Sequence, residues 1–338
     1  MKKASDAQLN LFGDAASAKS LSAKERVLGP IPEPDPDLVA LAKRVPARVK
    51  FGTSTWTFPG WKGLVYRRDY PSDASFTRQS LEEYAKYPLF RTVGIDRSYY
   101  APIAREELAA YAKQLPQGYR CVSKVWQQIT TYAFPNHARY GAKAGTRNPD
   151  FLNVELFKDA MFDPYADEFA QNAGPFVFEV PPSPVRADPL EFAGRIDEFL
   201  ANAPRSGSYA FEVRDAHLLH PTYFEVLRAH QAAHVFNAWA RMPSIEEQMA
   251  LAGDPAADFV VARLMMPQGG DYERLKRQFT PFNRMVLPQI EIRRHVLKLI
   301  ENALKFDRDI YVIANNKLEG SSPLTIKAIA KMLADGVE

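Results

Sequence analysis

The chain has 338 residues, of which 46% are hydrophobic and 25% charged, a composition typical of soluble globular proteins of one large or two smaller domains. The formal net charge of +3 is nearly balanced, so it neither indicates nor excludes nucleic acid as a partner. No apolar run approaches the roughly 18 residues of a membrane helix, the N-terminus lacks the apolar core of a secretory signal, and the single cysteine, Cys121, cannot form an internal disulfide. We therefore expect a cytoplasmic protein without a membrane partner.

Residues 1–48 differ from the rest of the chain. Ala, Ser and Lys dominate the start, and alternating prolines at positions 30, 32, 34 and 36 indicate an extended linker. The segment is predicted to be a flexible N-terminal extension with one short helix near residues 38–44.

Eight apolar runs rich in β-branched and aromatic residues follow and predict strands. They cover residues 49–55, 92–98, 119–125, 175–181, 208–214, 234–240, 259–265 and 309–316.

Helical patterns fall between these runs, at residues 76–87, 106–115, 155–172, 189–202, 221–232, 244–252, 289–305 and 323–335. Strands that alternate with helices indicate parallel pairing, and eight of them predict a single (β/α)8 TIM-type barrel, α/β in class, over residues 49–338. A doubly wound open sheet is the rival fold. The barrel is preferred because the strand count is eight and no dinucleotide-type glycine fingerprint follows the first strand.

Two connections are longer than the usual loop of a few residues, one over 127–153 and one over 267–288. Both follow strands and both carry several basic residues. They are therefore expected at the C-terminal face of the barrel, where barrel enzymes keep their active sites, and the middle of the second connection has a helical pattern.

Polar groups stand at the C-terminal ends of most predicted strands, although parallel strands buried on both faces are normally apolar. We predict that they meet at one mouth, with Glu212, Glu179, Asp96 and Lys124 as catalytic candidates. Ligand-binding candidates from the strand ends are Arg214, Arg263, Asn237, Asn315 and Asn316. The alternative is an ion-pair network that only closes the top of the barrel.

Two further patterns are expected near the mouth. Gly269, Gly270, Gly320, Ser321 and Ser322 follow strands seven and eight, where barrels often bind phosphate, although Ser322-Pro323 is also an ordinary helix start. The stretch 56–61, with Trp56 and Trp61, provides either an aromatic pocket wall or a plug over the barrel.

Metal and nucleophilic chemistry have weak signals. There is no HExxH pattern, and His217 and His220 beside a proline are more typical of a capped turn than of a ligand pair. Cys121 lies within a predicted strand, and no Gly-x-Ser-x-Gly elbow is present. We expect no metal and no cofactor.

Seven segments in order resemble the YecE-like family, called domain of unknown function 72. They are FGTSTWTFPGWKGLVY from residue 51, VGIDRSYYAP from 93, YRCVSKV from 119, FEVPP from 178, YAFEVR from 209, VVARL from 260 and YVIANN from 311. The resemblance implies a TIM-type barrel and an activity that is not assigned.

The resemblance also implies site positions, because Trp56, Trp61, Tyr100, Lys124, Glu212, Arg214, Arg263, Asn315 and Asn316 match the family pattern. The chain departs from that pattern at Asp96, Glu179, Thr131 and Met265, and the last two replace histidines. Losing two histidines further weakens a metal-based or histidine-based mechanism.

The extension contains Gln8-Leu9-Asn10-Leu11-Phe12, which resembles the bacterial sliding-clamp binding motif Q-L-x-L-F. Free apolar anchors in a tail suit docking into a partner's groove. The alternative is a tail segment that folds back on the barrel.

These observations leave three functions open. The first is an enzyme that acts by acid/base chemistry on a small phosphorylated or polyhydroxylated ligand. The second is a DNA-associated protein that is recruited by residues 8–12 and holds nucleic acid with its basic loops and tryptophans. The third is a binding scaffold without chemistry.

Overall fold

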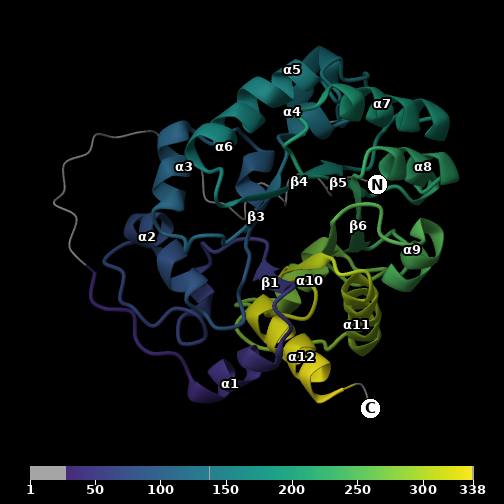
Figure 1. Ribbon diagram of the computed structural model, residues 1–338. Helices are drawn as coiled ribbons and strands as arrows, with labels where there is room; N and C mark the ends of the chain where they lie inside the picture. The colour runs from purple at the N-terminus through teal and green to yellow at the C-terminus, as the bar shows by residue number, and fades with distance from the viewer. Residues whose placement is uncertain (1–27, 137, 337–338) are drawn as a thin grey trace.

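A computed structural model describes residues 28–136 and 138–336. Within them, eight parallel strands form one sheet in the order β1-β8-β7-β6-β5-β4-β3-β2, which curls into a nearly closed barrel. Figure 1 shows the strands at the centre with the helices around them. The predicted TIM-type barrel is thereby confirmed.

The strands are short, as expected for a barrel of this size. They are β1 Val49–Thr53, β2 Gly94–Ile95, β3 Cys121–Lys124, β4 Ala173–Val180, β5 Tyr209–Val213, β6 Ala233–Ala238, β7 Phe259–Leu264 and β8 Asp309–Ala314.

The main helices lie between the strands. They are α1 Pro36–Arg44, α2 Asp73–Ala85, α3 Arg105–Ala112, α4 Gln127–Thr130, α5 Val154–Phe157, α6 Asp163–Glu168, α7 Pro189–Asn202, α8 Pro221–Ala229, α9 Ile245–Ala252, α10 Tyr272–Phe279, α11 Ile290–Lys305 and α12 Ser322–Asp335. Short 3-10 turns cover Pro59–Trp61, Asp96–Tyr99 and Ala216–Leu218, and a π-helical turn, Lys158–Phe162, joins α5 to α6.

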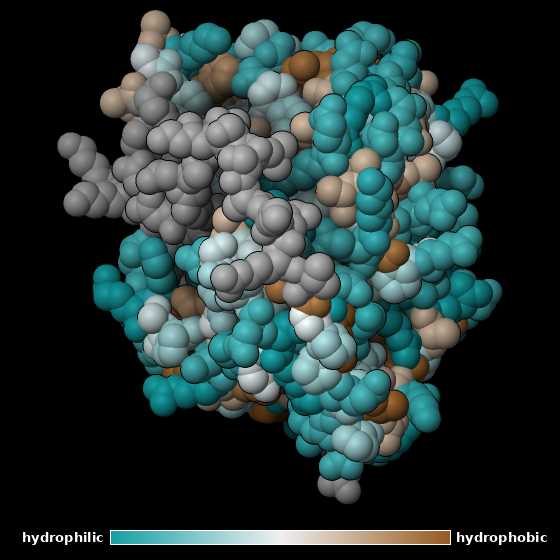
Figure 2. All heavy atoms as spheres, turned by 90° about the vertical axis from the view of Figure 1, so that its left-hand side faces the viewer, coloured by the Kyte–Doolittle hydropathy of each residue, from teal (hydrophilic) through white to brown (hydrophobic). Residues whose placement is uncertain are grey.

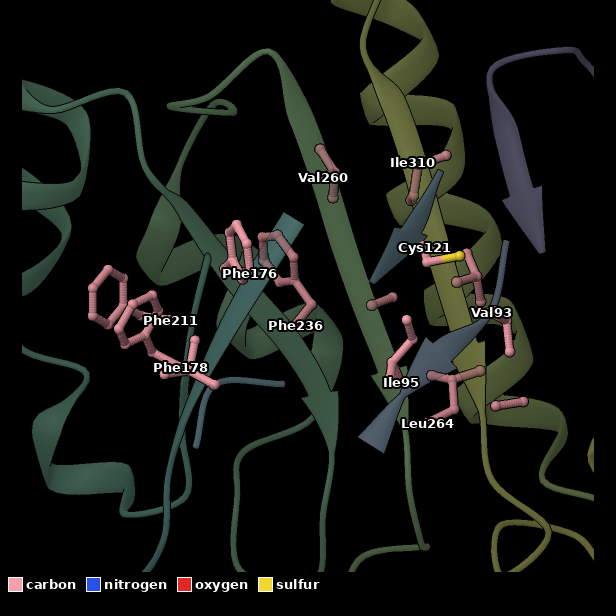
Figure 3. Close-up of a cluster of buried hydrophobic side chains, with 14 of the residues drawn as sticks. Val93, Ile95, Cys121, Phe176, Phe178, Phe211, Phe236, Val260, Leu264 and Ile310 are labelled. Carbon is pink, nitrogen blue, oxygen red and sulfur yellow. The ribbon is translucent and has the colours of Figure 1, made fainter. Parts of the chain in front are cut away.

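Alternation along the strands separates the side chains into two cores. Outward-facing residues such as Phe178, Phe211 and Leu264 pack against the helices in one large cluster (Figure 3). Inward-facing residues form a smaller apolar layer inside the barrel, which includes Val177 and Val261. Two residues further along β3, β4, β5 and β7, the inward positions become charged, with Lys124, Glu179, Glu212 and Arg263. A charged layer therefore rests directly on an apolar floor.

The seam between β1 and β2 has no continuous ladder. Phe51 O accepts from the backbone N–H groups of Arg91 and Thr92, at 2.9 and 3.3 Å. The Tyr84 hydroxyl accepts from Thr53 N–H at 2.9 Å and donates to Thr92 O at 3.3 Å. The two strands approach so closely that a Cβ on Gly52 would lie 2.2 Å from Thr92 O.

Part of the expected N-terminal extension belongs to the folded body. Helix α1 lies beside α12 (Figure 1), and its residues Leu38 and Leu41 are buried in the main core. The Arg91 guanidinium donates to the carbonyls of Ala42 and Pro46, at 2.8 and 2.6 Å, and holds the helix end in place. The folded unit thus begins before residue 49. The clamp-like segment, residues 8–12, lies outside the described residues.

None of the helices among the described residues is long and apolar enough to cross a membrane. The face in Figure 2 is mainly hydrophilic, with apolar side chains scattered among polar ones.

Candidate functional site

A charged layer crosses the barrel just above the apolar floor. Lys124 ends β3, Glu179 and Glu212 lie near the ends of β4 and β5, and Arg263 lies near the end of β7. Arg214 follows β5, and Asp96 directly follows β2. Alternation along the strands turns these positions inward, as predicted from the strand ends.

Two carboxylates are neighbours in this layer. Glu179 and Glu212 are opposite one another in the β4–β5 register, where like charges repel unless cations bridge them. Arg214 does so, with contacts of 2.7 Å to Glu179 Oε2 and 3.0 Å to Glu212 Oε1. Arg263 contacts both carboxylates as well, at 2.8 Å to Glu179 Oε2. The pair is therefore held by two guanidinium groups.

The same network extends to the remaining two charges. Lys124 Nζ lies 2.6 Å from Glu179 Oε2 and 3.8 Å from the centre of the Tyr99 ring. Arg263 Nη2 lies 2.6 Å from Asp96 Oδ2. Three cations and three carboxylates thus neutralise one another.

Burial and charge shift the pKa values of this network in different directions. Burial raises the pKa of Asp96 above its usual value, and Arg263 and Lys124 offset this only in part. Burial also lowers the pKa of Lys124. Burial alone would raise the pKa of Glu179, but Arg214, Lys124 and Arg263 outweigh it and lower that pKa. Asp96 is therefore a carboxyl group with a raised pKa, and Glu179 is a stable anion.

A pocket opens above the charged layer, with an empty volume of about 860 Å³ that includes its open mouth. Its aromatic walls come from several connections. They are Phe58, Trp61, Tyr100, Trp239, Tyr272 and Phe282. Its polar lining consists of Ser54, Thr55, Thr57, Asp96, Lys124, Glu179, Arg214, Asn315, Asn316, Lys317 and Ser322. This mixture suits a small ligand with an apolar face and several polar groups.

Asn316 organises one wall. Its Oδ1 accepts from Trp61 Nε1 at 3.2 Å and from both the backbone N–H and the hydroxyl of Ser322 at 2.8 Å. Next to it, Asn315 Nδ2 donates to Ser54 Oγ at 2.8 Å. These bonds fix the orientation of both amides and tie the end of β8 to the loop after β1.

The structure separates the predicted site residues into two groups. Trp61, Tyr100, Asp96, Lys124, Glu179, Arg214, Asn315, Asn316 and Ser322 line the pocket. Glu212 and Arg263 lie beneath it in the charged layer, and both are almost completely buried. They are in position to hold pocket residues, whereas a ligand in the pocket would not touch them.

Trp56 and Asn237 lie in the core rather than in the pocket wall. Trp56 is 2% exposed and packs edge-on against Tyr111, with ring centres 4.9 Å apart. Asn237 is buried and donates from Nδ2 to Val213 O at 3.0 Å. Neither residue lines the pocket.

The glycines and serines predicted to bind phosphate are not gathered around one space. The N–H groups of Gly269, Gly270 and Gly320 already donate to carbonyls of Ala240, Pro267 and Asn316. Of the five predicted residues, Ser322 alone lines the pocket, and Ser321 is buried. Phosphate binding at these residues stays a prediction, without support from their arrangement.

Sequence reasoning missed Lys317, Tyr272 and Phe282 as lining residues. The sequence could have indicated Lys317 as a lining residue, because it directly follows Asn315 and Asn316 after the end of β8. Tyr272 begins α10 and Phe282 follows it, both in the second long connection. Their approach to the mouth depends on the path of that connection.

Two of the described histidines, His220 and His234, have structural contacts. His220 is the N-cap of α8 and accepts from Thr222 N–H at 3.3 Å, the capping role considered from the sequence. His234 is buried against Tyr223 and Gln248. No group of three or more His, Cys, Asp or Glu within residues 28–136 and 138–336 is arranged to hold a metal ion.

These features define the class as a TIM-type barrel protein with an aromatic-walled pocket over a buried charged layer. The family model described as "Protein of unknown function DUF72" matches residues 50–338, so the chain belongs to that family. The resemblance seen in the sequence is confirmed.

Solved structures of two DUF72 family proteins share the fold. The protein from Thermotoga maritima has 19% sequence identity and a TM-score of 0.60, with 84% of this chain and 98% of that chain covered. The protein from Enterococcus faecalis has 17% identity and a TM-score of 0.56, with coverages of 86% and 97%. Identities this low establish the shared fold alone. A comparison with curated proteins gives no match.

Proposed function

We propose that the barrel mouth binds a small anionic or polyhydroxylated molecule and that Asp96 exchanges a proton with it. The observation that carries this proposal is the position of Asp96, a carboxyl group with a raised pKa that lines the pocket. A general acid or base works best when its pKa lies near the working pH.

The surroundings of Asp96 support this role. Its Oδ2 is fixed 2.6 Å from Arg263, while Oδ1 has no hydrogen bond among the described residues. One oxygen thus orients the group and the other is available to a ligand. Glu179 and Arg214 provide fixed charges nearby, and Glu212 and Arg263 are positioning residues below them.

The charges of the pocket support an anionic ligand. Lys317 also lines the mouth and is buried, so among the lining residues three cations, Lys124, Arg214 and Lys317, face the two carboxyl groups of Asp96 and Glu179. A ligand with negative charge would balance the excess. The amides of Asn315 and Asn316 would orient hydroxyl or phosphoryl oxygens, and the aromatic walls would cover the apolar face of a sugar-like ring.

The test follows proton transfer directly. The protein is incubated in D₂O with a panel of sugar phosphates and hydroxy acids, with binding measured by calorimetry and deuterium incorporation by NMR. Asp96→Asn keeps the shape and one acceptor for Arg263. It is expected to retain binding within a few-fold and to slow exchange by at least about 100-fold.

The matched control is Glu291→Gln, which removes an exposed carboxylate on α11. It should behave as the wild type. Equal exchange rates in the wild type and Asp96→Asn would contradict the role of Asp96, and no binding by any member of the panel would contradict the ligand class.

A second candidate function is association with DNA. Arg274, Lys276, Arg277 and Arg284 all lie on the connection after β7, and none of them forms a salt bridge within the described residues. Cations without protein partners are available to phosphates. Affinity for a single-stranded oligonucleotide should then fall steeply between 50 and 200 mM salt, and absence of binding at the lower salt would remove this candidate. A pull-down with Leu11→Ala and Phe12→Ala tests recruitment by the sliding clamp separately.

A further inference from the structure

Two buried lysines line the pocket, and they have different partners. Lys124 Nζ lies 2.6 Å from Glu179 Oε2, so its charge is neutralised. Lys317 is 7% exposed and forms no salt bridge with any described residue. Its Nζ lies 3.3 Å from Asn315 Oδ1 and 4.7 Å from the centre of the Tyr272 ring. Lys317 therefore places a buried amine at the pocket with no ion-pair partner among the described residues, although the charges of Asp96, Lys276 and Arg214 also act on it.

The local backbone aims this side chain. Asn315 Oδ1 accepts from the Lys317 backbone N–H at 3.0 Å, which closes a tight turn directly after β8. The neighbouring Leu318 is completely buried in the main core. With Leu318 anchored in the core, the turn holds Lys317 at the pocket, where it is a lining residue.

Burial at the aromatic-walled pocket favours the uncharged form of this amine. Phe58 packs against Trp61 and Phe282, with ring centres 5.3 and 6.0 Å apart, and all three line the pocket. Burial lowers the pKa of Lys317 from 10.5 to about 8. At pH 7.5 roughly a quarter of such amines are uncharged, against about one in a thousand at the usual value.

We propose that Lys317 captures the carbonyl group of a small aldehyde or keto acid as a protonated imine. The inference rests on the proposed function, because it places the ligand in the same pocket and uses Asp96 as the acid. It adds the chemical class of the ligand, a carbonyl compound with an anionic or hydroxyl group.

The reaction balances without an oxidant or reductant. The uncharged Nζ attacks the carbonyl carbon, a C–N bond forms, and the carbonyl π pair moves to oxygen. A proton passes from nitrogen to that oxygen and gives a carbinolamine. Asp96 in its protonated form donates a proton to the hydroxyl group, which leaves as water while the nitrogen lone pair forms C=N. The products are an iminium, an ionised Asp96 and water, so the net charge of Lys317 and Asp96 together is unchanged.

The experiment uses the full chain with glyoxylate or glycolaldehyde and sodium cyanoborohydride, which reduces an iminium to a stable amine. Adducts are counted by intact mass and located by peptide mapping from pH 6 to 9. At pH 7.5 Lys317 is expected to react at least about ten-fold faster than Lys62, an exposed lysine whose pKa is raised by Asp69. The rate at Lys317 should rise with a midpoint near pH 8.

Two variants complete the test. Lys317→Arg should lose the fast adduct, whereas Lys62→Arg should keep it. Labelling of the wild type is itself decisive, so the result does not depend on how well a variant folds. If Lys317 in the wild type reacts no faster than Lys62 at any pH in the range, the inference is overturned.

The outcome is separable from that of the proposed function. Ligand binding and Asp96-dependent deuterium exchange without fast labelling of Lys317 would refute the imine and leave the acid/base proposal standing. Fast, selective labelling of Lys317 together with unchanged exchange in Asp96→Asn would support the imine and refute the role of Asp96.

Discussion

Replacing Glu212 by Gln is expected to destabilise the barrel rather than to remove a catalytic group. The Glu212 side chain is completely buried, and Arg214 Nε donates to its Oε1 at 3.0 Å. Its Oε2 accepts from Arg263. The substitution would leave three cations against two carboxylates in a closed layer, with Glu179 alone bridging Arg214, Arg263 and Lys124.

The magnitude follows from that arrangement. Removing one partner of a buried ion pair costs about 3–5 kcal/mol, because the remaining charges stay desolvated. Gln keeps the size of the side chain and one carbonyl acceptor, so we expect the lower end, about 3 kcal/mol. At roughly 2–4 °C per kcal/mol, the melting temperature should fall by about 6–12 °C.

Chemical denaturation of the wild type, Glu212→Gln and the surface control Glu291→Gln measures this loss. Deuterium exchange is then measured on the folded variant, well below its melting temperature, and should stay within a few-fold of the wild type. A stability loss below about 1 kcal/mol together with lost exchange would refute the reasoning, because Glu212 would then act in the chemistry.

Two further predictions concern parts of the fold away from the mouth. Burial lowers the pKa of His234 to about 4, so the unfolded state binds more protons below pH 6.5. Above pH 6.5 protonation of His234 costs the folded state no stability. As the pH falls from 6.5 to 4, the free energy of unfolding should decrease by up to about 3 kcal/mol because only the unfolded state binds the proton. The pH dependence of the free energy of unfolding should lack this decrease in His234→Gln. Gly52→Ala should cost about 3 kcal/mol, because its Cβ would lie 2.2 Å from Thr92 O. Gly194→Ala, where nothing lies within 4 Å, should instead stabilise helix α7 by about 0.5–1 kcal/mol.

The positions of the strands were predictable because parallel strands in a barrel are apolar runs with few alternatives. The residues at which strands and helices begin and end were less predictable. The second predicted strand, 92–98, has only two residues in a ladder, since the chain turns into a 3-10 helix at Asp96. The single helix predicted over 155–172 contains a π-helical turn before Pro164, whose missing N–H and ring disturb the regular α-helical pattern.

The charged layer was also predictable, because all strands of a parallel barrel end at one face. The depth of each charged side chain below the pocket could not be predicted from the sequence. Glu212 and Arg214 are two residues apart and point to the same side, so only their height along the strand decides that Arg214 lines the pocket and Glu212 does not. Tyr272 escaped prediction because it is placed by the packing of the long connection around α10, which no local pattern specifies.

The seam between β1 and β2 is the part of the barrel wall where we expect local opening first. Elsewhere neighbouring strands are joined by backbone ladders, whereas here the Tyr84 phenol supplies part of the closure. Local opening follows the weakest cooperative contacts, so the seam should separate before any other strand pair. Ser54 follows β1, Asp96 follows β2, and both line the pocket. Tyr84→Phe removes the hydroxyl that bridges Thr53 and Thr92, so backbone hydrogen exchange at the ends of β1 and β2 should become faster in this variant.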